Sequence, residues 1–309
     1  MSDIKLFSLT GVSPVELASK SVALEKSLQS LIESHLNAFL GVRFLATEYS
    51  TGKVHGGRID TLGIDENGCP VIIEYKRSTN ENVINQGLFY LDWLLDHRAE
   101  FTLLAMKTLG ADIESKVDWS APRLVCIAHD FTRYDEHAVQ QIDRNVELIR
   151  YRKYESGFLV LELVNATTGS VTSGNGGGTE GSTSKVKQSG TYKTVSQYYE
   201  QASPELRALC DSLEAFLLSL GDDVTKKALK LYYAFRRIKN FACVEVHPQT
   251  ETLVVYAKVD PAAVELKGGF TRDVHNIGHF GTGDLEIRIS SPDDLEAAKP
   301  LLLKSYESS

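Results

Sequence analysis

The chain has 309 residues, which is long enough for two ordinary domains that each bury a core of their own. Hydrophobic residues make up 42% of the sequence and charged residues 24%, and these values exclude a fibrous or generally disordered protein. The net charge of −8 argues against a protein that coats nucleic acid by bulk electrostatics, but it does not exclude a nuclease, which needs only local basic residues.

The sequence has no sign of export, of a membrane span or of a cysteine-based site. No apolar run approaches the roughly 18 residues that a membrane span needs, and the first residues lack the pattern of a signal peptide. We therefore expect a cytoplasmic location and no membrane partner. The cysteines are far apart and form no Cys-x-x-Cys pair, so buried thiols are expected. They are Cys69, Cys126, Cys210 and Cys243.

The predicted first domain, residues 1–164, begins with an amphipathic helix over 14–40, whose apolar residues recur at helical spacing. A second helix is predicted over 81–97, opened by Ser78-x-x-Glu81, a pattern typical of a capping box. Strands are predicted over 42–49, 58–65, 71–76, 101–106, 123–128, 146–152 and 158–164. The first domain is therefore expected to be α/β or α+β with a mixed sheet.

A flexible linker and a second domain are predicted after the first domain. Residues 165–194 are rich in glycine, serine and threonine and have no apolar periodicity, which indicates a linker. The second domain, residues 195–309, is expected to be a smaller α+β domain. Its helices are predicted over 195–201, 204–220 and 223–235, and its strands over 241–246, 252–258 and 285–290.

Three charged residues of the first domain are predicted to converge. Glu74 and Lys76 are two residues apart on a strand, so both point to the same face of the sheet. The apolar run before them indicates a buried strand, where charges need partners or a metal. If Gly68 takes the left-handed conformation in the turn at 65–68, Asp60 lies opposite Glu74 on the neighbouring strand.

Two carboxylates and an ammonium suit the hydrolysis of a phosphodiester. Carboxylate oxygens bind Mg²⁺ or Mn²⁺, which polarises a phosphoryl group, and a nearby lysine orients the attacking water. The alternative is a salt-bridged cluster on one sheet face, because cross-strand ion pairs are common. The catalytic interpretation is favoured because the pattern extends into both helices.

The two predicted helices contribute further candidates. On a helical wheel Glu25 lies inside the apolar arc of the first helix, whereas Glu33 points about 130° away from its centre and is expected to be solvated. Glu25 is therefore the candidate third carboxylate and metal ligand, with a boundary glutamate as the alternative. Gln86 and Tyr90 share one face of the second helix and could bind a water, a phosphate or a base. Lys53, Arg58 and Arg77 are candidates for nucleic-acid phosphates, or are solvated surface charges.

These residues, over roughly 25–97, resemble the PD-(D/E)XK nuclease superfamily, and within it the branch with a Q-x-x-x-Y helix motif, seen in the nuclease domain of RecB and in mismatch endonucleases. The resemblance rests on Glu25, Gly57-Arg58-Ile59-Asp60, Ile73-Glu74-Tyr75-Lys76 and Gln86-x-x-x-Tyr90. Ile59 stands where the superfamily pattern has proline, but the carboxylate is the functional part of that motif.

The resemblance implies a restriction-endonuclease-like fold and a Mg²⁺-dependent DNA endonuclease or exonuclease that acts in restriction or DNA repair. It implies that Asp60 and Glu74 are metal ligands and that Lys76 orients the water. Glu25, Gln86 and Tyr90 are then assisting catalytic residues. Cleavage of both strands would suit a homodimer.

The second half, over about 195–306, resembles a domain of unknown function found in restriction-type proteins and in proteins described as predicted transporters. Its Gly278–Asp284 segment is interpreted as a series of turns rather than a ligand loop. Two other functions stay open: a non-catalytic nucleic-acid or protein adaptor that retains the nuclease fold, and a transport-associated binding protein.

Overall fold

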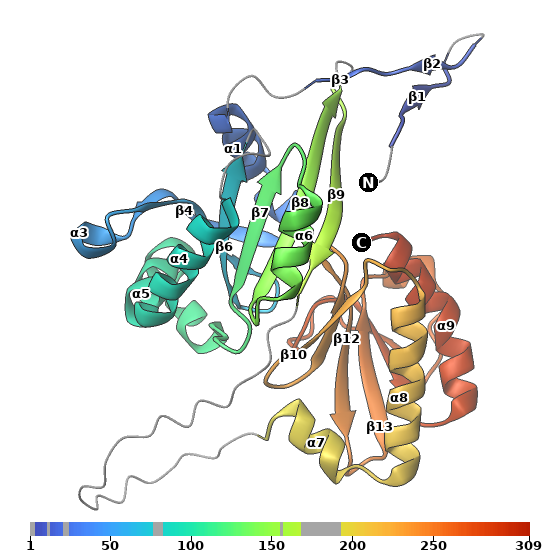
Figure 1. Cartoon of the computed structure of the whole chain (residues 1–309). Coiled ribbons are helices and arrows are strands. Elements are labelled where there is room, and N and C mark those ends of the chain that lie inside the picture. The colour runs from blue at the N-terminus through green and yellow to red at the C-terminus, as the bar shows by residue number, and fades with distance from the viewer. Residues whose placement is uncertain (1–3, 11–12, 21–24, 77–82, 155–156, 168–192) are drawn as a thin grey trace, which may run out of the picture. The chain divides into compact units, whose positions relative to one another are not determined.

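The computed structural model describes residues 4–10, 13–20, 25–76, 83–154, 157–167 and 193–309 (Figure 1). Contacts divide the chain into two compact units, Met1–Thr168 and Gly169–Ser309. Most of the predicted linker lies outside the described residues. In the part of the chain that the structure describes, we find no helix with the length and apolarity that a bilayer crossing requires.

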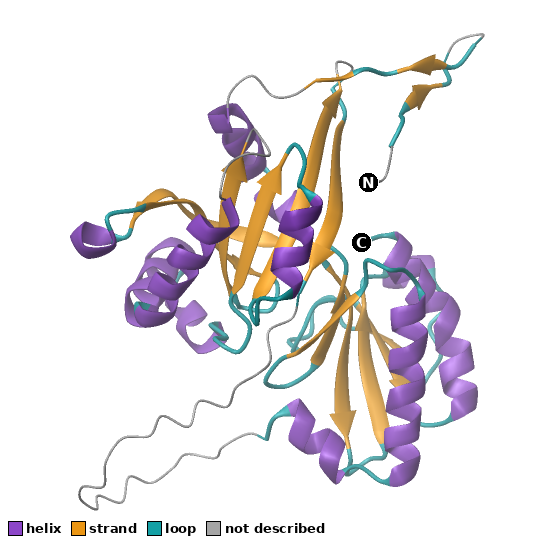
Figure 2. Cartoon of the chain, in the orientation of Figure 1, coloured by secondary structure: helices purple, strands orange, loops and turns teal. Residues whose placement is uncertain are grey.

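A seven-stranded mixed sheet forms the centre of the N-terminal unit (Figure 2). Its strands are β3 Ser19–Lys20, β4 Val42–Ser50, β5 Arg58–Asp65, β6 Pro70–Lys76, β7 Arg123–Ala128, β8 Asn145–Tyr154 and β9 Leu159–Ala166. The order is β3-β8-β7-β6-β5-β4, with β9 paired to β8. Strand β7 pairs in parallel with β6 and β8, and the other pairs are antiparallel. A separate small ladder joins β1 Phe7–Ser8 to β2 Val15–Glu16.

Helices cover both faces of this sheet. They are α1 Glu25–Ser34, α2 Leu36–Leu40, α3 Gly52–His55, α4 Val83–Asp96, α5 Arg98–Leu109, the 3-10 helix η1 Ala111–Lys116 and α6 Arg133–Gln140. Helix α1 contacts β5 and β6 on the face of Thr61. Helix α4 packs against β6 and β7 on the other face, in a core that includes Leu62 and Ile72. Adjacent strand residues point to opposite faces, so these two helices lie on opposite sides of the sheet.

The turn between β5 and β6 has the predicted geometry. Gly68 has a φ of +82°, in the left-handed region, and a Cβ there would lie 2.0 Å from the carbonyl oxygen of Lys116. The Asp65 Oδ1 accepts hydrogen bonds from the backbone amides of Asn67 and Cys69, both at 2.9 Å. This turn sets the register of the two strands that carry the predicted charged residues.

A buried ion-pair cluster ties β5, β7 and β8 together. The Arg123 guanidinium donates to Glu147 at 2.6 and 3.0 Å and to Asp65 Oδ2 at 3.0 Å. All three side chains are at least 97% buried. Burial lowers the pKa of Arg123, but the charges of Glu147 and Asp65 outweigh burial and raise it above its ordinary value. The cluster therefore holds a charged arginine inside the sheet.

Two predicted elements of this unit are wrong. The helix expected over 14–40 is replaced by strands before residue 21 and by two helices after residue 24. His35, at φ −133° and ψ 27°, leaves the helical region and separates α1 from α2. The strand expected over 101–106 is part of α5, because the buried Phe101 and Ala105 are four residues apart. The start predicted for the second helix, with its capping box, lies outside the described residues.

The C-terminal unit is a six-stranded antiparallel sheet with helices on one face (Figure 1). Its strands are β10 Thr225–Ala228, β11 Tyr233–Arg236, β12 Asn240–His247, β13 Thr252–Ala257, β14 Thr271–Asp273 and β15 Leu285–Ile289. Its helices are α7 Val195–Gln201, α8 Pro204–Ser219, the short 3-10 helix η2 Pro261–Ala263 and α9 Pro292–Glu307. Helices α8 and α9 pack side by side against the sheet.

One predicted element of this unit is wrong, and β14, η2 and α9 were not predicted. The helix expected over 223–235 is the β10–β11 hairpin, closed where the Leu229 amide donates to the Tyr232 carbonyl at 3.0 Å. Pairing of β11 with β12 outweighs the local spacing of apolar residues. Helix α9 was missed, although Ser291 caps it and Pro292 opens it. The predicted fold class, a mixed α/β sheet flanked by helices plus a smaller α+β domain, is confirmed.

Candidate active site

Asp60 and Glu74 lie side by side where the β5–β6 ladder ends. The ladder's final backbone pair is Thr61 with Ile73, and beyond it the two carboxylates accept hydrogen bonds from the main chain. The Asp60 amide donates to Glu74 Oε1 at 3.1 Å, and the Tyr75 amide donates to Asp60 Oδ2 at 3.0 Å. The two side chains thus bond crosswise to the opposite main chain, as the hairpin register predicts.

Lys76 follows Glu74 on the same face of β6. In the parallel register Glu74 pairs with Cys126 and Lys76 with Ala128. Burial raises the pKa of the Cys126 thiol, Glu74 raises it further, and the positive charge of Lys76 lowers it. Glu74 and Lys76 are two residues apart on β6, so both side chains lie on the sheet face of Cys126, as the sequence predicts.

A polar pocket opens beside Asp60. Its volume is about 450 Å³, and its lining includes Gln86 and Tyr90 from α4. The Tyr90 hydroxyl accepts hydrogen bonds from the Arg58 amide at 3.1 Å and from Gln86 Nε2 at 3.2 Å. A Cβ on Gly57 would lie 2.4 Å from the Tyr90 ring, so glycine permits this close approach. Gln86 and Tyr90, the two residues predicted from the second helix, therefore line the same pocket as the predicted carboxylate of Asp60.

Strand β4 contributes an unusual backbone conformation opposite Asp60. Thr47 pairs with Thr61 and Tyr49 with Ile59, which leaves Glu48 facing Asp60. Glu48 has a φ of +51°, a region that costs a non-glycine residue free energy and that recurs at functional sites. Its carboxylate pairs with Arg58 Nε at 2.5 Å. Glu48 is a site residue that the sequence pattern did not indicate.

Helix α1 contacts β5 beside the site through Gln29 and Glu33, neither of which the helical wheel indicated. The buried Gln29 amide donates to the Asp60 carbonyl at 2.8 Å and to Glu33 Oε1 at 3.1 Å. The Thr61 hydroxyl donates to the same Glu33 oxygen at 2.5 Å. Glu33 is thus half-buried against the sheet, and its predicted exposure to solvent is wrong.

The error arises because the helical wheel used apolar residues alone and assumed one helix. The wheel assumed one continuous helix to Leu40, so Leu36 and Phe39 helped to define the apolar arc. Because α1 ends at Ser34, these two residues belong to α2 and say nothing about the orientation of α1. The remaining apolar residues centre the arc even farther from Gln29 and Glu33, so apolar spacing alone does not predict that Gln29 is buried beside Leu28 and Ile32.

Gln29→Met removes the amide that serves the Asp60 carbonyl while keeping a side chain of similar length. We expect the N-terminal unit to lose about 1–3 kcal/mol of unfolding free energy, since buried acceptors lose their donor. Urea unfolding followed by tryptophan fluorescence measures this loss, because Trp93 and Trp119, the two tryptophans of the chain, lie in this unit. Ser30→Ala, at an exposed position of the same helix, should change stability by less than about 0.5 kcal/mol. Equal stability of both variants would contradict the role given to Gln29.

The structure describes the side chains of two of the remaining predicted site residues and not those of the other two. Arg58 is exposed at the rim of the polar pocket, and Lys53 is exposed on α3. The side chain of Glu25 and the whole of Arg77 lie outside the described residues. Their predicted roles stay predictions.

The donor set at the site suits a hydrated divalent cation. Within the described ranges, no three or more histidine, cysteine, aspartate or glutamate side chains form a group that could hold a metal ion by themselves. Mg²⁺ commonly takes one or two carboxylates and keeps several waters and substrate phosphates in its shell. The adjacent Asp60 and Glu74, each anchored by a backbone amide, fit that type of site.

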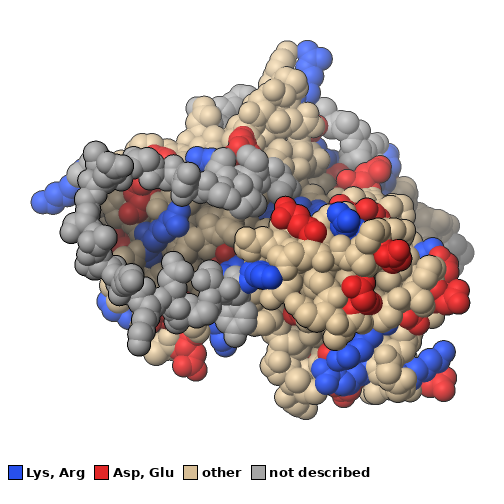
Figure 3. All heavy atoms as spheres, turned by 90° about the horizontal axis from the view of Figure 1, so that it is seen from below, with Lys and Arg blue, Asp and Glu red and all other residues tan. Residues whose placement is uncertain are grey.

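Acidic and basic side chains are interspersed on the face of the molecule seen in Figure 3. This mixture agrees with the net charge of −8. Among the basic side chains, Arg58 lines the polar pocket and Lys53 lines a neighbouring pocket.

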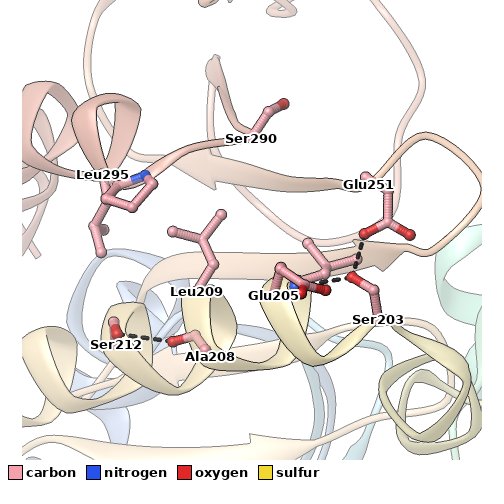
Figure 4. Close-up of a pocket in the computed structure, with 10 residues that line it drawn as sticks. Ser203, Glu205, Ala208, Leu209, Ser212, Glu251, Ser290 and Leu295 are labelled. Atoms are coloured by element: carbon pink, nitrogen blue, oxygen red, sulfur yellow. Dashed lines mark hydrogen bonds between the residues drawn. The ribbon is translucent and has the colours of Figure 1, made fainter.

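The C-terminal unit has a pocket of its own, of about 700 Å³, between α8 and the start of α9 (Figure 4). Leu209 and Leu295 face into it, and at one end Ser203 Oγ donates to Glu251 Oε2 at 2.5 Å. Ser203 also caps α8 through the Leu206 amide. This serine is therefore engaged in local structure, and the pocket has the composition of a contact groove rather than of a catalytic centre.

The Gly278–Asp284 segment packs closely on the sheet of this unit. Gly281, at φ +83°, lies against Cys243, and the Thr282 amide donates to the Cys243 Sγ at 3.4 Å. His279 stacks on Tyr256 at 4.1 Å between ring centroids. These contacts agree with the interpretation of the segment as a series of turns.

Comparisons with known proteins give a family match for the C-terminal half and a relative for almost the whole chain. Residues 195–309 match the family model described as a domain of unknown function (DUF5655), as expected for that half. An uncharacterised protein of Haemophilus influenzae is 26% identical over 311 residues, covering 98% of this chain and 100% of the relative.

Two solved structures are similar to part of the chain. One is a repair endonuclease from Pyrococcus abyssi, at 18% identity and a TM-score of 0.28, over 43% of this chain and 49% of the endonuclease chain. The other is a complex of EndoMS with double-stranded DNA, at 21% identity and a TM-score of 0.29, over 42% and 47% of the two chains. The matches span about half the length of these solved chains.

Proposed function

We propose that the N-terminal unit is a divalent-metal-dependent nuclease that hydrolyses DNA phosphodiester bonds, in restriction or DNA repair. The observation that carries the proposal is the pairing of Asp60 and Glu74 by opposite backbone amides, on the same sheet face as Lys76 and beside a polar pocket. Glu74 is fully buried and Asp60 is half-buried, and two carboxylates held next to each other repel unless a cation or proton joins them. A cation together with a phosphate satisfies this requirement.

Each residue near the pocket has a task in the proposal. Asp60 and Glu74 hold Mg²⁺ or Mn²⁺, and the bound cation would polarise the phosphoryl group and lower the cost of developing negative charge. Lys76 orients the attacking water through its ammonium. Gln86 and Tyr90 position the phosphate or water from the α4 side of the pocket. Glu25 remains the proposed additional acidic residue.

The surrounding network positions these groups. Gln29 binds the carbonyl of Asp60, and Glu33 binds both Gln29 and Thr61 beneath the same strand. These residues act through β5 and touch no reacting atom. Arg58 lines the pocket and Lys53 lines a neighbouring pocket, and both are candidates for phosphates of the bound nucleic-acid strand. Arg77 is a further candidate by sequence.

Lys76→Ala is expected to lower the rate of plasmid cleavage in Mg²⁺ or Mn²⁺ by about 10²-fold or more, the range typical of a group that assists proton transfer or water positioning. Lys107→Ala, at an exposed position of α5, is the matched control and should cleave at the normal rate. Cleavage by the wild-type chain should stop when EDTA removes the metal.

The same assay separates the proposal from its rivals. Nucleic-acid binding without cleavage in either metal would indicate an adaptor that retains the fold. Equal cleavage by Lys76→Ala and Lys107→Ala would exclude this site as the source of activity. Binding of a small solute without binding of nucleic acid would favour a transport-associated protein.

A further inference from the structure

A second pocket adjoins the candidate active site at the outer end of the β4–β5 hairpin, where Figure 1 shows α3. Its volume is about 390 Å³, within the range of roughly 300–1,000 Å³ that is usual for ligand sites. It shares Ser50 with the pocket that contains Asp60. Its lining residues are Ser50, Thr51, Gly52, Lys53, His55, Trp93, His97 and Glu100. We call it the ring pocket.

Helix α4 and the residue that follows it run along both pockets. Gln86 and Tyr90 line the pocket of Asp60, and Trp93 and His97 line the ring pocket. Steps of four, three and four residues keep these side chains on one side of the helix. Tyr90 and Trp93 are separated by about 4.5 Å along the helix axis, from the rise per residue. A nucleic-acid strand that is bound at Asp60 and runs along α4 therefore passes the ring pocket.

Flat rings form the wall of this pocket. Trp93 and His97 stack at 4.6 Å between centroids and 16° between planes. His55 lies 4.8 Å from Phe89 and stands edge-on to His97 at 6.3 Å. Trp93 is 2% exposed and belongs to the core, whereas Phe89 is 48% exposed. Trp93 is thus fixed by packing, the pocket-lining His55 and His97 are half-buried, and Phe89 lies beside the pocket rather than in its lining.

The rim offers hydrogen-bonding groups of both kinds. The Tyr49 hydroxyl donates to Glu100 Oε1 at 2.6 Å. Burial, together with this hydrogen bond and the charge of Glu100, raises the pKa of Tyr49 to about 12, so the phenol keeps its proton and orients the carboxylate. Glu100 can accept from an amino group, and Lys53 can donate to a ring nitrogen or carbonyl. A nucleobase matches both features of the pocket, because it is a flat ring with hydrogen-bonding groups along its edge.

From these contacts we propose that the ring pocket binds one unstacked nucleobase of the strand whose phosphate lies at Asp60 and Glu74. The proposal rests on the proposed nuclease function and narrows its substrate. A base in a matched duplex is paired and stacked and must be extruded at a cost, whereas a single-stranded or mismatched base leaves the stack more easily. The ring pocket therefore favours substrates with an unpaired base near the cleaved bond.

Fluorescence of 2-aminopurine tests the proposal, because this base loses emission when it stacks on a ring. The full chain is titrated, with Ca²⁺ in place of Mg²⁺, against a single strand, a matched duplex and a duplex with one mismatch, each with 2-aminopurine at the test position. We expect quenching with the single strand or the mismatched duplex. His97→Ala should bind these about tenfold more weakly, the loss typical of one stacked base.

Matched variants separate stacking from other roles of His97. His97→Phe keeps a flat ring and should retain the quenching, whereas loss in both variants would overturn stacking as the cause. Tyr134→Ala removes a 70% exposed aromatic ring on α6 and should behave as the wild type. His55→Ala, on α3, repeats the test if His97→Ala fails to fold, which circular dichroism would detect.

The outcomes distinguish the ring pocket from the nuclease. If His97→Ala and His55→Ala leave the quenching unchanged, base binding in the ring pocket is overturned, even if Mg²⁺-dependent cleavage is normal. Quenching that depends on these residues without cleavage in Mg²⁺ supports the pocket and contradicts the proposed function. Quenching with only one of the two unpaired substrates supports the pocket and identifies whether the base comes from a single strand or from a mismatch. Failure of all three oligonucleotides to bind overturns both.

Discussion

Asp60→Asn is expected to lower the rate of metal-dependent DNA cleavage by on the order of 10³-fold, because the loss of one anionic metal ligand removes several kcal/mol of transition-state stabilisation. The amide keeps the size of the side chain and an oxygen that can accept from the Tyr75 amide, which now bonds Asp60 Oδ2 at 3.0 Å. The fold should therefore persist. Initial rates on plasmid and on oligonucleotides in Mg²⁺ measure the effect.

Asp92→Asn is the control for this charge change. Asp92 is exposed on α4, the helix that lines the pocket, so its replacement alters the net charge equally without touching the site. Normal cleavage by Asp92→Asn beside a strong loss in Asp60→Asn would tie the activity to the paired carboxylates. Similar rates for both variants would remove Asp60 from the mechanism.

Arg123→Ala has the largest expected effect on stability. Without the guanidinium, Asp65 and Glu147 are two buried carboxylates that lose their shared cation. Removing one partner of a buried ion pair costs about 3–5 kcal/mol. Urea unfolding followed by tryptophan fluorescence reports this loss in the N-terminal unit, since Trp93 and Trp119 both lie there.

Two comparisons make this test specific. Arg144→Ala, at an exposed position just before β8, should change the unfolding free energy by less than about 0.5 kcal/mol. Arg123→Met combined with Glu147→Met replaces the ion pair by apolar side chains of similar length and should recover part of the loss, because fewer charges remain buried. An unfolding free energy of Arg123→Ala within 1 kcal/mol of the wild type would show that the cluster contributes little.

The strands that carry the charged residues were predictable because local and long-range signals agree. Strand β5 begins and ends where the sequence predicts, and β6 begins one residue before its predicted start. Gly68 closes the turn in the conformation that places Asp60 beside Glu74. A short turn leaves one register available, so the pairing of these two strands follows from nearby residues alone.

Of the two helices beside the site, the sequence predicted the contribution of α4 but not that of α1. Gln86 and Tyr90 meet at the pocket because α4 is regular over the residues between them. The end of α1 could not be predicted, because the break at His35 leaves no signal such as proline or glycine at that residue. Gln29 was missed because a buried polar residue lies against the apolar pattern of its helix.

Tertiary pairing accounts for the other differences. The segment over 223–235 has apolar residues at helical spacing, yet β11 becomes a strand because its partner β12 is available. Glu48 could not be identified because a left-handed backbone at glutamate is imposed by its neighbours rather than by its own preference. Helix α9 did have a signal, in Ser291 followed by Pro292 and acidic residues, which is typical of a helix start.

The crosswise bonding of Asp60 and Glu74 has a consequence for insertions and deletions. Main-chain amides anchor both carboxylates, so their meeting depends on which residues of β5 and β6 stand opposite each other. Adding or removing one residue in the turn at 66–69 would shift that alignment and direct Glu74 to the α1 face of the sheet. Length variation in this turn would disable the site as fully as loss of a carboxylate, although the turn contributes no side chain to it.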